Sequence, residues 1–387
     1  MTVFKDKKMT KISFDGQGWE YFKIWIVNIL LMIVTIGLYY PWAKVRRRRY
    51  FYGNLSIAGR YFDYHATGKQ LFPSYLIGII LVISLTFIQH VSPSLAGITF
   101  IVIAIATPWL IQRSMRFNLK MTSFSNVRFS FSGPLNKAYW CYLLLPLLLI
   151  IAPLSLLGII LAVVDVGEEA MLAEIENMRD LPATWGLLLL VMASLAIWFK
   201  ALLTTQQTTY LLNHYHYGQG QFSIDIRVKE FVKIGFKSLA LLVVLPIIVV
   251  SPLLIMAQTT ISSVSGGWTP LYGLFYLVIT TATAAYYLSR TRQYLYQQLQ
   301  FDDQITFHSA LSARALFFVM ITNLFLIAIT LGLAIPWTQI RMAKLTAEAT
   351  AIEVQQLDDY IGQQEVAQSA LGEQLADGLD IDIGIAV

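Results

Sequence analysis

Long apolar segments constrain this chain more than any other feature. Eight of them are close to or above the length of about 20 residues that an α-helix needs to cross a bilayer. None carries Asp or Glu in its middle. They span residues 21–43, 72–89, 94–112, 139–164, 184–203, 232–257, 268–289 and 313–338. We therefore predict an all-α polytopic integral membrane protein with about eight hydrophobic segments.

The composition agrees with this class. Hydrophobic residues make up 56% of the 387 residues and charged residues only 13%, about half of what a soluble domain carries. These proportions exclude a disordered protein, a basic nucleic-acid-binding protein and an ordinary cytosolic enzyme. Because Cys141 is the single cysteine, the chain has no intramolecular disulfide and no cysteine-based metal site. We expect membrane lipids as partners and no nucleic acid.

The connections between the segments alternate in charge. Residues 90–95 and 258–270 carry no charge, and residues 165–183 carry six acids against one arginine. The other four connections are basic: residues 44–69, 113–137, 200–237 and 290–314. Because Lys and Arg accumulate in cytoplasmic loops, we predict that these four lie in the cytoplasm.

Each basic connection also contains a short, β-rich stretch. Apolar and polar residues alternate there around Gly, Asn or Asp, which is typical of a β-hairpin. The four stretches begin at Asn54, Met121, Asn213 and Gln298. They could pair edge to edge into a cytoplasmic sheet, or they could be four unrelated polar loops.

A polar motif recurs in the first and last apolar segments, and every pair of matching residues is separated by 295 positions. The third segment keeps part of it, Thr107, Pro108, Trp109 and Arg113. We predict an internal repeat of a hairpin–helix unit. The two full copies are Asn28, Thr35, Gly37, Pro41, Trp42 and Arg46, and Asn323, Thr330, Gly332, Pro336, Trp337 and Arg341.

The motif has two interpretations. An interrupted membrane helix exposes backbone carbonyls and half-helix ends, which can coordinate an ion or a substrate. Alternatively, Gly and Thr serve close helix packing, Asn bonds across helices, and the tryptophans anchor the chain at the membrane interface. The topology is open in the same way. If segments one and eight span once, both termini lie outside, whereas re-entrant segments place both inside.

Few other residues suggest chemistry. Arg46, Arg47, Arg48 and Arg49 either bind anionic lipid headgroups or only fix the orientation of the chain. His214 and His216 would share one face of a strand, but two ligands make a weak metal site. Because the chain has no phosphate-binding loop and no nucleophile or metalloprotease motif, we expect no catalytic residue, no cofactor and no metal. The protein is not expected to be an enzyme.

We divide the chain into three parts: a basic N-terminal segment (1–20), a membrane domain with internal repeats (21–340) and an acidic C-terminal tail (341–387). The tail holds nine acids and two bases. It either docks on the basic hairpins or is solvated.

The residues around the first copy of the motif resemble a known family. Phe14-Asp15-Gly16, the stretch from Thr35 to Arg46, and Tyr50 are similar to the YjgN family of bacterial inner-membrane proteins, which carry a domain of unknown function. The resemblance extends over nearly the whole chain, including the second Pro-Trp-x-x-x-Arg and the Asp380–Gly384 stretch. It implies an inner-membrane location and a multi-helix architecture, and it brings no substrate, cofactor or catalytic residue.

Two functions remain open, with a membrane enzyme ranked last. The first hypothesis is a small-solute or ion transporter or channel, whose path lies near Asn28 and Asn323. The alternative is a membrane-organising protein that binds lipid or a partner through the basic cytoplasmic hairpins.

Overall fold

Ten short strands form one closed antiparallel barrel in the computed structural model, which describes residues 8–164, 183–260, 269–302 and 304–354. The order around the barrel is β1-β10-β9-β8-β7-β6-β5-β4-β3-β2, so that strands from the two ends of the chain close the ring. The strands are β1 (Lys8–Phe14), β2 (Leu55–Ile57), β3 (Arg60–Tyr64), β4 (Thr122–Phe124), β5 (Val127–Phe131), β6 (Tyr215–Tyr217), β7 (Gly220–Ile224), β8 (Leu299–Phe301), β9 (Ile305–Ser309) and β10 (Thr350–Val354).

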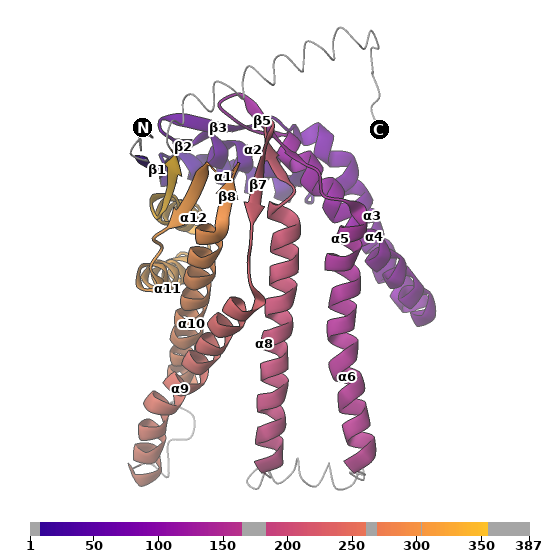
Figure 1. Ribbon diagram of the computed structural model, residues 1–387, viewed down its shortest axis with the longest axis vertical. Coiled ribbons are helices and arrows are strands. Elements are labelled where there is room, and N and C mark those ends of the chain that lie inside the picture. The colour runs from indigo at the N-terminus through magenta and orange to yellow at the C-terminus, as the bar shows by residue number, and fades with distance from the viewer. Residues whose placement is uncertain (1–7, 165–182, 261–268, 303, 355–387) are drawn as a thin grey trace, which may run out of the picture.

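The helices connect one strand pair to the next. In Figure 1 the barrel lies at the top, and α6, α8, α9 and α10 extend away from it. The helices are α1 (Gly18–Val34), α2 (Tyr40–Gly53), α3 (Gly68–Val91), α4 (Pro93–Lys120), α5 (Leu135–Tyr139), the π-helical turn η1 (Trp140–Leu144), α6 (Leu145–Val164), α8 (Ala183–Leu212), α9 (Val228–Thr260), α10 (Thr269–Gln298), α11 (Ala313–Ile329) and α12 (Ile335–Glu348).

The four hairpins predicted from the sequence are confirmed as β2–β3, β4–β5, β6–β7 and β8–β9. Positive φ angles at Ala58 and Gly59, and at Ser125 and Asn126, give the first two hairpins tight two-residue turns. Such turns match the twist of the flanking strands. Neighbouring hairpins pair with one another, and β1 pairs with both β2 and β10, so the ring has no free edge.

The prediction of an all-α protein with eight hydrophobic segments is wrong. Besides the barrel, the described residues contain three helices that are long and apolar enough to cross a membrane: Gly68–Val91, Pro93–Lys120 and Leu135–Ser155. The barrel was not predicted because its strands are only three to seven residues long. Strands β2 to β9 lie inside the polar connections, and β1 and β10 lie in the predicted N-terminal segment and tail. A search for apolar stretches of membrane length does not detect them.

The first and last apolar segments each break into two helices that begin and end at the barrel. Helix α1 follows β1 and α2 leads into β2, whereas α11 follows β9 and α12 leads into β10. The tip of the first helical hairpin contacts α3, where the Tyr75 hydroxyl donates to the Gly37 carbonyl (3.0 Å). Because Tyr75 lies seven residues into α3, the tip reaches only about 10 Å beyond the start of that helix.

Aromatic side chains fill the barrel. Phe62, Phe129, Phe222 and Phe307 occupy the middle of β3, β5, β7 and β9 and pack against a buried cluster that includes Phe124, Tyr217 and Phe301. Ring contacts at 4.6–6.3 Å link them in one chain from Phe129 through Phe62, Phe124, Tyr217, Phe301 and Phe222 to Phe307. Side chains just fill a barrel of about eight strands, so ten strands call for larger ones. We call these seven residues the aromatic core.

The domain boundaries stay predictions. The structure places β1 within residues 1–20, and it places α12 in part and β10 within the predicted tail. The rest of the tail lies outside the described residues, so its predicted docking on the basic hairpins stays a prediction.

A cross-link tests closure of the barrel by the chain ends. Met9 and Glu353 are directly opposed in the β1–β10 register, where Cα separations suit a disulfide. In a Cys141→Ser background, Met9→Cys with Glu353→Cys should form an oxidant-dependent disulfide, detected as a cross-linked peptide by mass spectrometry. The control pairs Met9→Cys with Ser130→Cys on β5. Absence of the first cross-link, or equal yield in the control, would contradict the closed ring.

Candidate functional site

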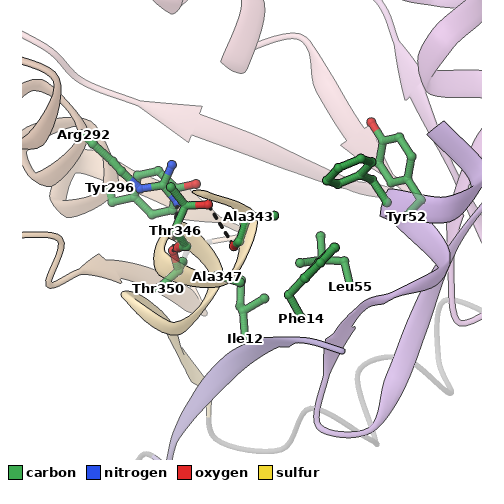
Figure 2. Close-up of a pocket in the computed structure, with 11 residues that line it drawn as sticks. Ile12, Phe14, Tyr52, Leu55, Arg292, Tyr296, Ala343, Thr346, Ala347 and Thr350 are labelled. Carbon is green, nitrogen blue, oxygen red and sulfur yellow. Dashed lines mark hydrogen bonds between the residues drawn. The ribbon is translucent and has the colours of Figure 1, made fainter. Parts of the chain in front are cut away.

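A cavity of about 280 Å³ lies at the junction of the barrel with α2, α10 and α12. Figure 2 shows its walls: Ile12, Phe14 and Leu55 come from β1 and β2, and Arg292 and Tyr296 come from α10. The ends of α12 and β10 add small and hydroxyl-bearing residues, namely Ala343, Thr346, Ala347 and Thr350. The cavity is therefore apolar on the barrel side and polar where the helices meet it.

A second cavity of about 410 Å³ adjoins the first and shares Phe51, Tyr52, Ala343 and Thr346 with it. It adds Arg47 and Arg48 from α2, together with Gln339 and Met342 from α12. We call the two cavities together the chamber. Three arginines line the chamber, and none of its lining residues is Asp or Glu.

Neutral acceptors hold Arg292 in place. Its Nη2 donates to the Thr350 hydroxyl (2.9 Å) and to the Thr346 carbonyl (3.2 Å). The guanidinium lies 4.5 Å from the centre of the Tyr296 ring. Its Nε is buried and has no hydrogen-bond partner in the described structure. These contacts position the guanidinium without neutralising its charge.

The other two arginines differ in their contacts. Arg48 donates to the Tyr64 hydroxyl (2.8 Å) and to the Asn118 side-chain oxygen, so neutral oxygens fix it as well. Arg47 is exposed to the cavity and makes no hydrogen bond or ion pair within the described part of the chain. An open hollow lined by one sign of charge concentrates counter-ions. The chamber thus favours anions.

Helices α1 and α12 meet beside the chamber. The Tyr21 hydroxyl donates to Oε1 of Gln339 (2.9 Å), which lines the second cavity. Burial raises the pKa of Tyr21 to about 12, although the charge of Arg47 acts to lower it. The hydroxyl therefore stays protonated at neutral pH and keeps its role as donor.

The Thr and Gly residues of the repeated motif build the two helical turns in the same way. Thr35 donates to Leu31 O (2.7 Å) and accepts from Tyr39 N (3.0 Å), and Thr330 has the same pair of contacts at the same distances. One threonine thus binds the last turn of one helix and the first turn of the next. Gly37 and Gly332 have φ angles of 85° and 91°, which favour glycine.

The Pro and Trp residues hold each helical hairpin against the next helix around the barrel. Pro41 and Pro336 are fully buried, as is Pro108 of the partial copy. Trp42 packs on Gly68 at the start of α3, where an added Cβ would lie 2.3 Å from the indole. Trp337 packs in the same way on Gly18 at the start of α1 (2.2 Å). Trp109 is half-exposed and lies 5.8 Å from the Arg113 guanidinium.

The two asparagines differ. Both are buried, but Oδ1 of Asn323 accepts from Arg341 (2.8 Å) and its Nδ2 donates to Thr338 O (3.3 Å). Oδ1 of Asn28 has no partner in the described structure, because Arg46 lies instead over the Tyr39 ring (5.7 Å). Neither asparagine lines the chamber. A transport path near both asparagines stays a prediction.

The arginine run divides into three kinds of residue. Arg46 is exposed, and Arg47 and Arg48 line the chamber. Arg49 donates to the carbonyls of Tyr64 (3.2 Å) and Ala66 (2.8 Å), which joins α2 to β3. The run thus serves both the cavity and the attachment of α2.

His216 of β6 and His214, which directly precedes this strand, both bond within the fold. His216 Nε2 contacts the Ser132 hydroxyl (2.7 Å), and His214 Nδ1 contacts Tyr210 O (2.7 Å). Burial, followed by the nearby charge of His214, lowers the pKa of His216. The described residues contain no group of three potential metal ligands.

Arg292, Tyr52 and the aromatic core were not among the residues predicted from the sequence. The phenylalanines could have been found, because one stands at the centre of the second strand in each predicted hairpin. Arg292 could not be distinguished from the other basic residues of its connection, since its role depends on α12, which is distant in sequence.

Helices of membrane-spanning length beneath a capping barrel define an integral membrane protein. The chain belongs to a bacterial family of unknown function, DUF898, whose profile matches residues 9–378. The resemblance to YjgN is confirmed by curated relatives named "Inner membrane protein YjgN". The relative from Salmonella typhimurium is 29% identical over 90% of each chain, and that from Escherichia coli O157:H7 is 24% identical over 89% of each.

A third relative, from Escherichia coli K12, is 32% identical over 36% of this chain and 35% of its own length. The names of these relatives support an inner-membrane location for this protein. No solved structure matches the chain.

The contact between Trp42 and Gly68 can be tested by substituting two glycines of α3. Gly68→Ala should destabilise the protein by about 1–3 kcal/mol, because Trp42 must move. Gly78→Ala, with nothing within 4 Å of the added Cβ, should stabilise it by about 0.5–1 kcal/mol through helix propensity. Thermal unfolding in detergent measures both. Shifts of the same sign and size would show that Trp42 does not hold α3.

The asparagines give a second matched pair. Asn323→Leu removes the buried acceptor of Arg341, which keeps only the exposed Thr322 hydroxyl (3.1 Å), and should cost about 1.5–3 kcal/mol. Asn28→Leu removes an oxygen that has no partner and should leave the free energy of unfolding nearly unchanged. Chemical denaturation of the two variants in the same detergent compares them. Equal losses would mean that Asn28 also has a partner in the folded protein.

Proposed function

We propose that this protein is a non-enzymatic, multi-pass transporter or channel for small anions in the inner membrane, with the chamber as its binding site. The observation that carries the proposal is the presence of three arginines and no carboxylate in the chamber walls. Charges taken out of water are normally paired, yet Arg48 and Arg292, both half-buried, have hydrogen bonds only to neutral groups. A site that leaves positive charge uncompensated is suited to a negative ligand, which would complete it.

The positive-inside rule supports a cytoplasmic barrel. The hairpins β2–β3, β4–β5, β6–β7 and β8–β9 lie in the four basic connections. In this orientation the chamber lies near the cytoplasmic surface. The equal geometry of the turns at Thr35 and Thr330 supports an internal repeat, with one copy of the helical hairpin on each side of the chamber.

The aromatic core would act as the gate. In the described state it fills the barrel, so an anion could not pass along the barrel axis unless rings moved. Phe222 and Phe307 are only partly buried, and ring rotation is a local change. Opening would therefore need fewer rearrangements than unpairing a strand.

The helical hairpins favour a second candidate, a membrane-organising protein. The tip residues Ile36 and Leu331 are each 93% exposed. Two shallow apolar hairpins inserted from one side would occupy one leaflet more than the other. This function requires no solute flux, which separates it from the first.

Anion flux tests the proposal. Proteoliposomes of phosphatidylcholine are loaded with chloride or with phosphate, and efflux is followed under a potential that drives anions outward. Phe222→Ala should raise the efflux above that of the wild type, because it opens a gap in the aromatic core. In the Phe222→Ala background, Arg47→Gln should weaken the apparent anion affinity about tenfold. This is the loss expected when one charge-assisted hydrogen bond to the anion is removed.

Arg46→Gln is the matched control. It removes the same charge as Arg47→Gln, but the Arg46 side chain, one position earlier, does not line the chamber. Its flux should equal that of the parent. If neither the wild type nor Phe222→Ala passes either anion above protein-free vesicles, the transport proposal fails and the membrane-organising function takes its place.

A further inference from the structure

A groove separate from the chamber lies between α2, α3 and α4. It has a volume of about 1040 Å³. Its walls are the first half of α2, the first two turns of α3 and the last turns of α4. Both α3 and α4 are of membrane-spanning length. The groove therefore lies where these two helices leave the bilayer on the barrel side.

Three cations from three helices line this groove: Lys44, Lys69 and Arg113. None of its lining residues is Asp or Glu. Within the described part of the chain, neither lysine makes a hydrogen bond or an ion pair. Burial, followed by the charges of Arg48 and Arg47, lowers the pKa of Lys44. The groove thus gathers positive charge without an internal counter-ion.

Aromatic rings accompany the cations. Tyr40 stacks on Tyr75 across the α2–α3 boundary (5.2 Å between centroids), and Trp109 lies beneath the Arg113 guanidinium. Tyr and Trp are enriched at the level of lipid headgroups. The combination of cations with these rings is what an interface between headgroups and hydrocarbon requires.

The surface below the groove is apolar and uncovered. Ile77 and Ile80 of α3 are 64% and 56% exposed, and Ile105 of α4 is 50% exposed. No residue in the most apolar 18-residue window of α3 is buried by the protein. An acyl chain that continued from the groove would therefore meet a hydrocarbon-like surface.

We propose that the groove is a binding site for one anionic glycerophospholipid, whose phosphate lies among Lys44, Lys69 and Arg113 and whose acyl chains follow α3 and α4. The volume of the groove exceeds the space that a free phosphate would fill. A small ion would also leave the aromatic and apolar walls without a contact. The site does not depend on anion transport, because it shares no lining residue with the chamber.

Lipid binding to the purified full-length protein in detergent tests the site, with phosphatidylglycerol as the probe and native mass spectrometry as the readout. Each removed charge should weaken binding about fivefold. Lys69→Gln, which changes an exposed side chain, should therefore show about that loss. The triple variant Lys44→Gln, Lys69→Gln, Arg113→Gln should lose the tightest-bound lipid altogether. Phosphatidylcholine should bind the wild type more weakly than phosphatidylglycerol does.

The charge-matched control is Lys11→Gln, Arg46→Gln, Lys120→Gln, which removes three exposed cations outside the groove and should bind as the wild type does. Equal losses in both triple variants would mean a diffuse electrostatic effect and would overturn the site. Displacement of the lipid by millimolar inorganic phosphate or glycerol 3-phosphate would identify a free-phosphate site instead. Unchanged binding in Lys69→Gln also counts against the proposal.

Discussion

The pairing of β1 with β10 is the interaction on which the rest of the structure depends. Isolated hairpins of three to five residues per strand are marginal in water. Here each hairpin gains hydrogen bonds by pairing with its neighbours, and the ring closes where Lys8–Lys11 meets Ala351–Val354. Once the ring is closed, the positions at which all helices leave it are fixed. The chamber and the groove both follow from those positions.

The two helical hairpins convert this closed ring into sites. Their threonine turns send α2 and α12 back toward the barrel, where Arg47 and Thr346 meet Arg292 of α10 in one chamber. The same return of α2 sets Lys44 beside α3 and α4. A plain membrane-crossing helix would carry these cations away from the barrel. The repeated motif thus acts through the direction it gives to the chain, which agrees with its packing interpretation.

Local patterns were predicted well and long-range ones poorly. The four hairpins could be predicted because alternation and turn residues are local, as at Ser125 and Asn126. The break at Thr35–Gly37 was also visible. Closure of the barrel was not, because no local pattern shows that β1 pairs with a strand more than 300 residues later. The chamber was missed for the same reason, since Arg48, Arg292 and Thr346 meet only in the folded chain.

The order of strands around the barrel has a consequence for biosynthesis. Strand β1 is made before every described helix, yet its second partner, β10, is made after all of them. Until then β1 and β9 each present an unpaired edge, which is the kind of surface that quality-control proteases and chaperones recognise. A chain that stops before Thr350 would keep both edges open. Closure of the ring therefore hides both edges as soon as β10 has been made.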